Sequence, residues 1–88
     1  MDLQYPIEVI TFNPVEIMVK NSDKEYFELT WENDTHAWSI NAWPWDNERN
    51  EYGSHEHMGQ YRNLPQILET ISLGRYAFYD MNEVDSCS

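Results

Sequence analysis

Apolar and polar residues alternate along the first half of the chain, as expected for β-strands with one buried face. Four strands are predicted from this alternation, at Ile7–Phe12, Val15–Lys20, Glu25–Glu32 and Ala37–Trp43. Asn13 and Pro14 end the first strand, and turn-forming residues at 21–24 and 33–36 separate the later ones. The connections are short, which favours antiparallel hairpins over parallel crossovers.

The apolar positions also predict how the strands pair, because a slip of one residue would turn every apolar side chain to the wrong face. Between the second and third strands, the pairs that keep apolar residues together are Val19 with Phe27, Ile17 with Leu29 and Val15 with Trp31. Between the third and fourth, they are Trp31 with Trp38, Leu29 with Ile40 and Phe27 with Ala42. The sequence therefore predicts an antiparallel meander whose central strand is Glu25–Glu32.

A helical period replaces the alternation in the second half of the chain. Apolar residues at i, i+3, i+4 and i+7 form one stripe, made of Leu64, Ile67, Leu68 and Ile71. Asn63 is suited to cap the start of this helix, and Pro65 is tolerated in its first turn. Gly74 is expected to end it.

The segments on either side of the helix complete the expected fold. Asp46–Gln60 is polar and contains Gly53 and Gly59, which predicts a long loop of the kind that often carries function. Arg75–Met81 is aromatic and is predicted to form a last strand, followed by a polar tail from about residue 82. The expectation is a single α+β domain over residues 1–88, with a four-strand antiparallel meander, a C-terminal strand and one helix packed on the sheet.

Charge changes this picture more than any motif does. Sixteen acidic and five basic residues give a net charge of −11 on 88 residues, beyond the magnitude of about 2–8 usual for a small soluble domain. Aromatic residues make up 15% of the chain, so a disordered acidic segment is not expected. Nucleic acid and anionic membranes are unfavourable partners for such a surface, whereas a basic protein is a favourable one.

Cysteine usage and the absence of targeting patterns suggest a compartment. Cys87 is the single cysteine, so no disulfide within the chain is expected, as in a reducing environment. Met1–Ile10 lacks the basic and then apolar pattern of a secretion signal. No apolar run approaches the roughly 20 residues that span a bilayer. The expected location is the cytoplasm, including that of an infected host cell, and the oligomeric state is left open.

The outward side of the predicted meander is the first candidate binding surface. With the apolar residues of the third strand in the core, Glu28 and Glu32 point to solvent, and Glu16 of the second strand joins them. Carboxylates on a rigid strand can compete for the Lys and Arg side chains with which another protein grips phosphates. The alternative is an ordinary solvated sheet face, but the lack of interspersed Lys and Arg favours a functional one.

The second candidate is the predicted loop with its flanks, where acidic and aromatic residues are interleaved. With Asp34 of the preceding turn, its expected partner-binding residues are Asp46, Glu48, Glu51, Glu56, Tyr52, Trp43 and Trp45. Tyr and Trp suit interface hot spots, and acids speed the encounter with a basic partner. The alternatives are a solvated loop and, for the tryptophans, packing in the core.

His55 and His57 raise the question of a metal site. In an extended segment the two side chains would share one face. A divalent site needs three or four ligands, and Asp46, Glu51 or His36 would have to supply the rest. No metal or other cofactor is therefore expected.

The sequence contains no set of residues typical of an enzyme. A glycine-rich phosphate loop, a Cys-x-x-Cys pair and a convincing nucleophile–His–acid group are all missing from it. A chain this short also has little room for a substrate pocket of the usual few hundred Å³. Enzymatic activity is not expected.

In size, charge and compactness the chain resembles the small acidic proteins by which phages block host defence nucleases, such as anti-CRISPR proteins. Acidic immunity proteins and antitoxins that neutralise basic nuclease toxins share these features. Both classes imply a stoichiometric inhibitor that occupies a cationic nucleic-acid-binding surface, by mimicry of nucleic acid in some cases. A structural or assembly subunit with merely solubilising charge, and a small His-based metal binder, are the alternatives of other classes.

Overall fold

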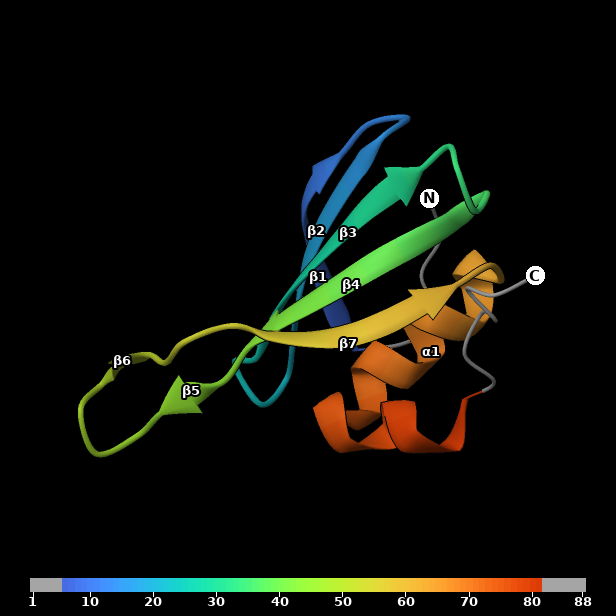
Figure 1. The fold of residues 1–88 in the computed structure, drawn as a ribbon. Coiled ribbons are helices and arrows are strands. Elements are labelled where there is room, and N and C mark those ends of the chain that lie inside the picture. The colour runs from blue at the N-terminus through green and yellow to red at the C-terminus, as the bar shows by residue number, and fades with distance from the viewer. Residues whose placement is uncertain (1–5, 82–88) are drawn as a thin grey trace.

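A computed structural model describes residues 6–81 and shows an antiparallel sheet with helices on one face (Figure 1). The sheet has five strands in the order β1-β2-β3-β4-β7. Their bounds are Ile7–Phe12 for β1, Glu16–Asn21 for β2, Tyr26–Glu32 for β3, Ala37–Trp43 for β4 and Glu56–Tyr61 for β7. Helix α1 (Leu64–Leu73) packs on this sheet, which confirms the predicted α+β class. The predicted polar tail, with Cys87, lies outside the described residues.

The predicted strand registers are confirmed. Across β2 and β3, Ile17 lies opposite Leu29 and Val19 opposite Phe27, and the Trp31 amide donates to the Val15 carbonyl at 2.9 Å. Across β3 and β4, the observed pairs include Phe27 with Ala42, Leu29 with Ile40 and Trp31 with Trp38. β3 is the middle strand of the five, so the central strand was also predicted correctly.

The prediction of a long loop over Asp46–Gln60 is wrong. The segment contains β5 (Trp45–Asp46), β6 (Glu51–Tyr52) and the edge strand β7. β4 and β7 pair with each other, and β5 pairs with β6 beyond them, so the two halves form one long hairpin. Its tip extends past the rest of the sheet in Figure 1. In β7 the polar side chains and an irregularity in register between Ile40 and Asn41 hide the strand alternation.

The predicted strand at Arg75–Met81 is also wrong, because Arg75–Asp80 forms a 3₁₀-helix, η1. Gly74 separates α1 from η1 with φ 104° and ψ 164°, a conformation that is nearly exclusive to glycine. Phe78 of η1 is buried and its ring lies 5.9 Å from that of Phe27. The last aromatic segment therefore covers the core as a second helical element instead of extending the sheet.

The core lies between the helical layer and the inner face of the sheet. Its largest fully buried side chains are Phe27, Ile17, Leu29, Ile40, Ile67, Ile71 and Val19. The predicted helix is confirmed, since Ile67, Leu68 and Ile71 are all buried and the Asn63 side chain accepts from the Gln66 amide at the N-terminus.

Strand β1 forms one edge of the sheet and is poorly covered. Val9, Ile10 and Phe12 are exposed, as is Val15 in the turn to β2. The register with β2 shifts between Val9 and Thr11, which marks a β-bulge of the kind that bends edge strands. The opposite edge is β7.

A candidate partner-binding face

The side of the sheet opposite the helices is here called the outward face. The strand pairings and the alternation of burial assign it these residues: Glu8, Thr11, Glu16, Met18, Lys20, Tyr26, Glu28, Thr30, Glu32, Ser39, Asn41, Trp43, His57 and Gln60. Both described helical elements pack on the other side. Within residues 6–81, no helix covers this face, and Tyr52 of the β5–β6 hairpin approaches it at Tyr26.

Glu16, Glu28 and Glu32 share the outward face, as predicted. Glu16 lies opposite Thr30, and Glu28 lies between Met18 and Asn41 of the neighbouring strands. All three residues are half-buried, and their carboxylates form no ion pair with any residue of the described chain. Strand geometry separates Glu28 from Glu32 by about 13 Å. The carboxylates are thus spread over the face, with neutral polar side chains between them.

The expectation that Lys and Arg are missing from this face is wrong at one position. Lys20 lies opposite Glu8 on β1 and opposite Tyr26 on β3. Among residues 6–81 it is the one Lys or Arg side chain on the outward face, and it lies near the end from which the hairpin extends. The face is therefore strongly but not uniformly negative.

The acidic residues of the hairpin are of two kinds: one is bonded within the hairpin, and the others are exposed to solvent. Asp46 Oδ1 accepts from the amides of Glu48 at 2.9 Å and Arg49 at 3.2 Å, and Oδ2 lies 3.9 Å from the Arg49 side chain. Asp46 therefore holds the turn between β5 and β6. Glu48 and Glu51 are exposed and are free to meet a partner. Asp34 is exposed in the β3–β4 turn, at the opposite end of the sheet from this hairpin.

A chain of aromatic rings joins the hairpin to the outward face. The ring centroids are 4.9 Å apart for Trp45 and Tyr52, 5.8 Å for Tyr52 and Tyr26, 6.3 Å for Tyr26 and Trp43, and 5.3 Å for Trp43 and His55. Trp43 and Trp45 are half-buried, so neither is a freely exposed anchor. Tyr52 is 39% exposed. These contacts fix the hairpin against the sheet.

Four of these side chains form a shallow apolar depression. Met18, Tyr26, Trp43 and Tyr52 line about 300 Å³ of space that is open to solvent. Burial raises the pKa of the Tyr26 hydroxyl above its usual 10.0, and Tyr52, Glu28 and Glu8 nearby raise it further. The depression, named here the aromatic depression, is therefore apolar inside and lies in a negative field.

Sequence reasoning named Trp43 and Tyr52 but did not include Met18 and Tyr26 among the site residues. The strand register alone places Met18 and Tyr26 on the same face, on paired strands. That signal was present in the sequence. The approach of Tyr52 to Tyr26, however, depends on the hairpin, for which the sequence pattern predicts a loop.

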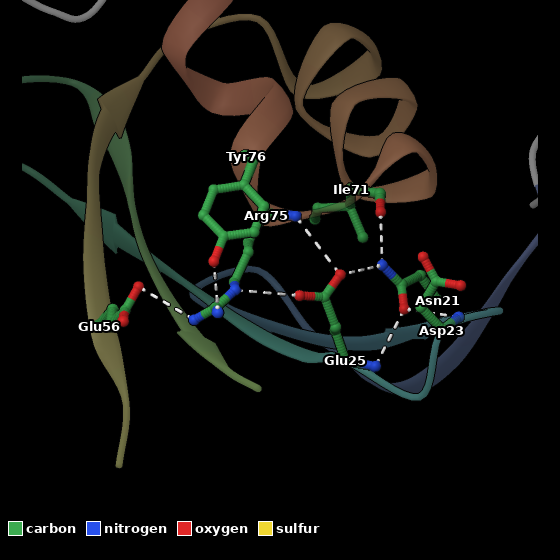
Figure 2. A network of polar contacts seen from close by, with 7 residues as sticks. All are labelled: Asn21, Asp23, Glu25, Glu56, Ile71, Arg75 and Tyr76. Atoms are coloured by element: carbon green, nitrogen blue, oxygen red, sulfur yellow. Dashed lines mark hydrogen bonds and ion pairs between the residues drawn. The ribbon is translucent and has the colours of Figure 1, made fainter. Parts of the chain in front are cut away.

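Glu56 does not belong to the outward face. It lies opposite Ala42, and its carboxylate is 3.2 Å from Nη1 of Arg75. Arg75 also pairs with Glu25 at 3.4 Å, and Asn21 donates to that same Glu25 carboxylate at 3.1 Å (Figure 2). Glu56 thus belongs to a network that joins β7 to the start of η1 and the end of α1. Its side chain is still 56% exposed, and its expected contact with a partner stays a prediction.

His55 and His57 do not converge with other ligands. The His55 ring packs on Trp43, and His57 Nδ1 lies 3.4 Å from Asn41 Oδ1. In the part of the chain that the structure describes, no group of three or more His, Cys, Asp or Glu side chains could hold a metal ion. His36 lies in the β3–β4 turn, beside Trp31.

Comparison with protein-family models, with curated proteins and with solved structures found no match. Among residues 6–81, no helix has the length and apolar character needed to cross a membrane. The functional argument therefore rests on the geometry and charge of this chain.

Proposed function

We propose that this protein is a non-enzymatic, stoichiometric inhibitor that binds the basic nucleic-acid-binding surface of a partner protein. Its carboxylates take the place of nucleic-acid phosphates on the partner's Lys and Arg side chains. The proposed setting is the cytoplasm, with phage counter-defence of the anti-CRISPR kind as the biological role. An immunity protein or antitoxin against a basic nuclease toxin would use the same mechanism.

The observation that carries this proposal is that most basic side chains have partners within the described part of the protein, whereas the carboxylates of the outward face do not. Most basic side chains are engaged by the protein itself: Arg75 by Glu25 and Glu56, Arg49 by Asp46, Arg62 by the Thr35 carbonyl and Lys24 by the Trp45 ring. The carboxylates of the outward face have no such partners among the described residues. The outward face therefore presents carboxylates that no cation of the described chain pairs with.

The architecture supports the proposal in a second way. The helices pack on one side of the sheet, and the strands hold Glu16 and Glu28 on the other. A rigid sheet fixes the backbone positions of these residues before binding, so that only their side chains lose conformational freedom when a partner docks. Glu48 and Glu51 on the hairpin extend the negative field beyond the sheet.

The proposal is tested by capturing the partner at low salt, eluting it with a salt gradient and repeating the binding with DNA or RNA present. The identified partner is expected to bind nucleic acid and to release this protein when nucleic acid is added. Affinity should fall steeply with salt, because several charge contacts form at once. A partner that binds equally well in the presence of saturating nucleic acid would refute the mechanism.

Charge variants localise the interaction. Removing two carboxylates with Glu16→Gln and Glu28→Gln is expected to weaken partner binding by about tenfold or more, as for charge pairs in an interface. The control, Asp23→Asn with Asp80→Asn, removes the same charge from exposed positions off the outward face. Equal losses in the two variants would show that only net charge matters.

The alternative function, of a different class, is that of an assembly subunit whose acidic residues serve only to keep the protein soluble. The aromatic chain from Trp45 to Trp43 is the observation that favours it. Binding in that case would be insensitive to salt and would depend on the aromatic side chains alone.

A further inference from the structure

We propose that the aromatic depression is the docking site for an arginine side chain of the basic partner. Met18, Tyr26, Trp43 and Tyr52 would contact the side chain from below and from the sides, and Glu28 and Glu8 would complement its charge. This inference rests on the proposed function in taking the partner to be a basic protein. It adds the type of partner residue that is recognised, an arginine, and the place on this protein where that residue binds.

The shape and lining of the depression suit this occupant. Three of its four lining residues are aromatic, and the fourth, Met18, is a polarisable side chain that adapts to irregular shapes. A guanidinium group is planar and weakly hydrated, and it stacks on aromatic faces more readily than an ammonium group does. An uncharged apolar side chain would fill the same space but would gain nothing from the surrounding carboxylates.

The electrostatic surroundings select a cation. Glu28 lies beside Met18 on the neighbouring strand and two residues from Tyr26 on its own. Glu8 lies opposite Lys20, which in turn lies opposite Tyr26. Burial raises the pKa of the Tyr26 hydroxyl, and Tyr52, Glu28 and Glu8 raise it further, in keeping with carboxylates placed close to this ring. Lys20 opposes a cationic ligand, so Lys20→Gln is expected to strengthen binding.

The protein already places its own cations over neighbouring aromatic rings. Lys24 Nζ lies 5.3 Å from the centre of the Trp45 ring, and Arg75 Cζ lies 4.7 Å from that of Tyr76. In the described part of the chain, no cation lies over Tyr26, Trp43 or Tyr52. The depression thus has the aromatic lining used elsewhere in this fold, but no internal cation occupies it.

The test is an NMR titration of the full chain with the peptide acetyl-Gly-Arg-Gly-amide and its lysine and citrulline counterparts. Citrulline has nearly the shape of arginine without the charge. The expected order of affinity is arginine, then lysine, then citrulline. Signals of the Trp43 indole and the Met18 methyl should shift, and those of the buried Trp38 should not. Equal binding of arginine and citrulline, or shifts centred elsewhere, would overturn the inference.

A matched pair of variants checks the location. Tyr52→Ala removes one wall of the depression from the exposed hairpin, and affinity for the arginine peptide should fall by about three- to fivefold, as expected for one cation–aromatic contact. Tyr79→Ala removes an equally large, exposed ring from η1 and should leave the affinity unchanged. Similar effects of the two variants would also overturn the inference.

The failure of this inference and that of the inhibitor proposal can be told apart. If the arginine peptide binds in the depression but nucleic acid does not displace the partner, the docking site stands and the inhibitor mechanism falls. If nucleic acid displaces the partner while arginine and citrulline peptides bind alike, the mechanism stands and the docking site falls.

Discussion

Asn21 connects three parts of the molecule through a single side chain. Its Nδ2 donates to the Ile71 carbonyl of α1 at 2.9 Å and to Glu25 at 3.1 Å, while its Oδ1 accepts from the amides of Asp23 and Glu25 (Figure 2). The residue is 5% exposed. A buried amide group with all these partners orders the β2–β3 turn and holds the end of the helix against it.

Replacing Asn21 should therefore be costly. Asn21→Ala removes the acceptor of the Asp23 and Glu25 amides and one of two donors to the Ile71 carbonyl, which keeps the Gly74 amide. We expect a loss of about 1–3 kcal/mol in the free energy of unfolding. Urea denaturation of the variant, with Ser22→Ala at an exposed position of the same turn as control, measures this loss. A change below about 0.5 kcal/mol, typical of an ordinary surface position, would contradict the interpretation.

At the scale of elements, the sequence allowed the meander to be predicted but not the hairpin or η1. Paired apolar residues such as Leu29 and Ile40 define one register, because any slip exposes them. In β7 only Gly59 and Tyr61 are buried, so its alternation is too sparse to recognise. Arg75–Asp80 carries aromatic residues that suit a strand, but Phe78 alone points into the core.

The candidate site, like the fold, could be predicted from the sequence only in part. The outward placement of Glu16 and Glu28 follows from strand parity, which the sequence contains. The inward placement of Glu56 and the contact between Tyr26 and Tyr52 both depend on the β4–β7 hairpin. These features require long-range pairing of polar strands, for which local pattern offers no evidence.

Gly74 forms the break between helix α1 and the 3₁₀-helix η1. Its φ of 104° is unfavourable for other residues, and a Cβ atom there would lie 3.3 Å from Glu25 Oε1, the oxygen that accepts from Asn21. Gly74→Ala is therefore expected to reduce the free energy of unfolding by about 1–3 kcal/mol. Thermal denaturation measures it, and Gly53→Ala, where the nearest atom is a side-chain carbon at 3.4 Å, is the milder comparison. Unchanged stability of Gly74→Ala would refute the assigned backbone conformation.

At the scale of the whole molecule, the net charge of −11 means that added salt should stabilise the fold but weaken binding to a basic partner. Added salt screens the repulsion among carboxylates within the folded chain. The melting temperature should rise between low and physiological salt, by on the order of 5 °C, which corresponds to about 1 kcal/mol in a domain of this size. Over the same range the affinity for the basic partner should fall. Calorimetry that shows a falling melting temperature would mean that favourable ion pairs outweigh the repulsion.

The exposed apolar edge strand gives this acidity a further consequence. Val9, Ile10 and Phe12 lie on β1 with no strand on its far side in the described sheet, the arrangement from which edge-to-edge polymerisation starts. Two copies approaching along this edge each bring a strongly negative charge, and at low ionic strength that repulsion keeps them apart. The bulge beside Ile10 adds a geometric obstacle. The acidic surface thus also protects the molecule's colloidal stability, and concentrated salt removes that protection at the same time as it stabilises the individual fold.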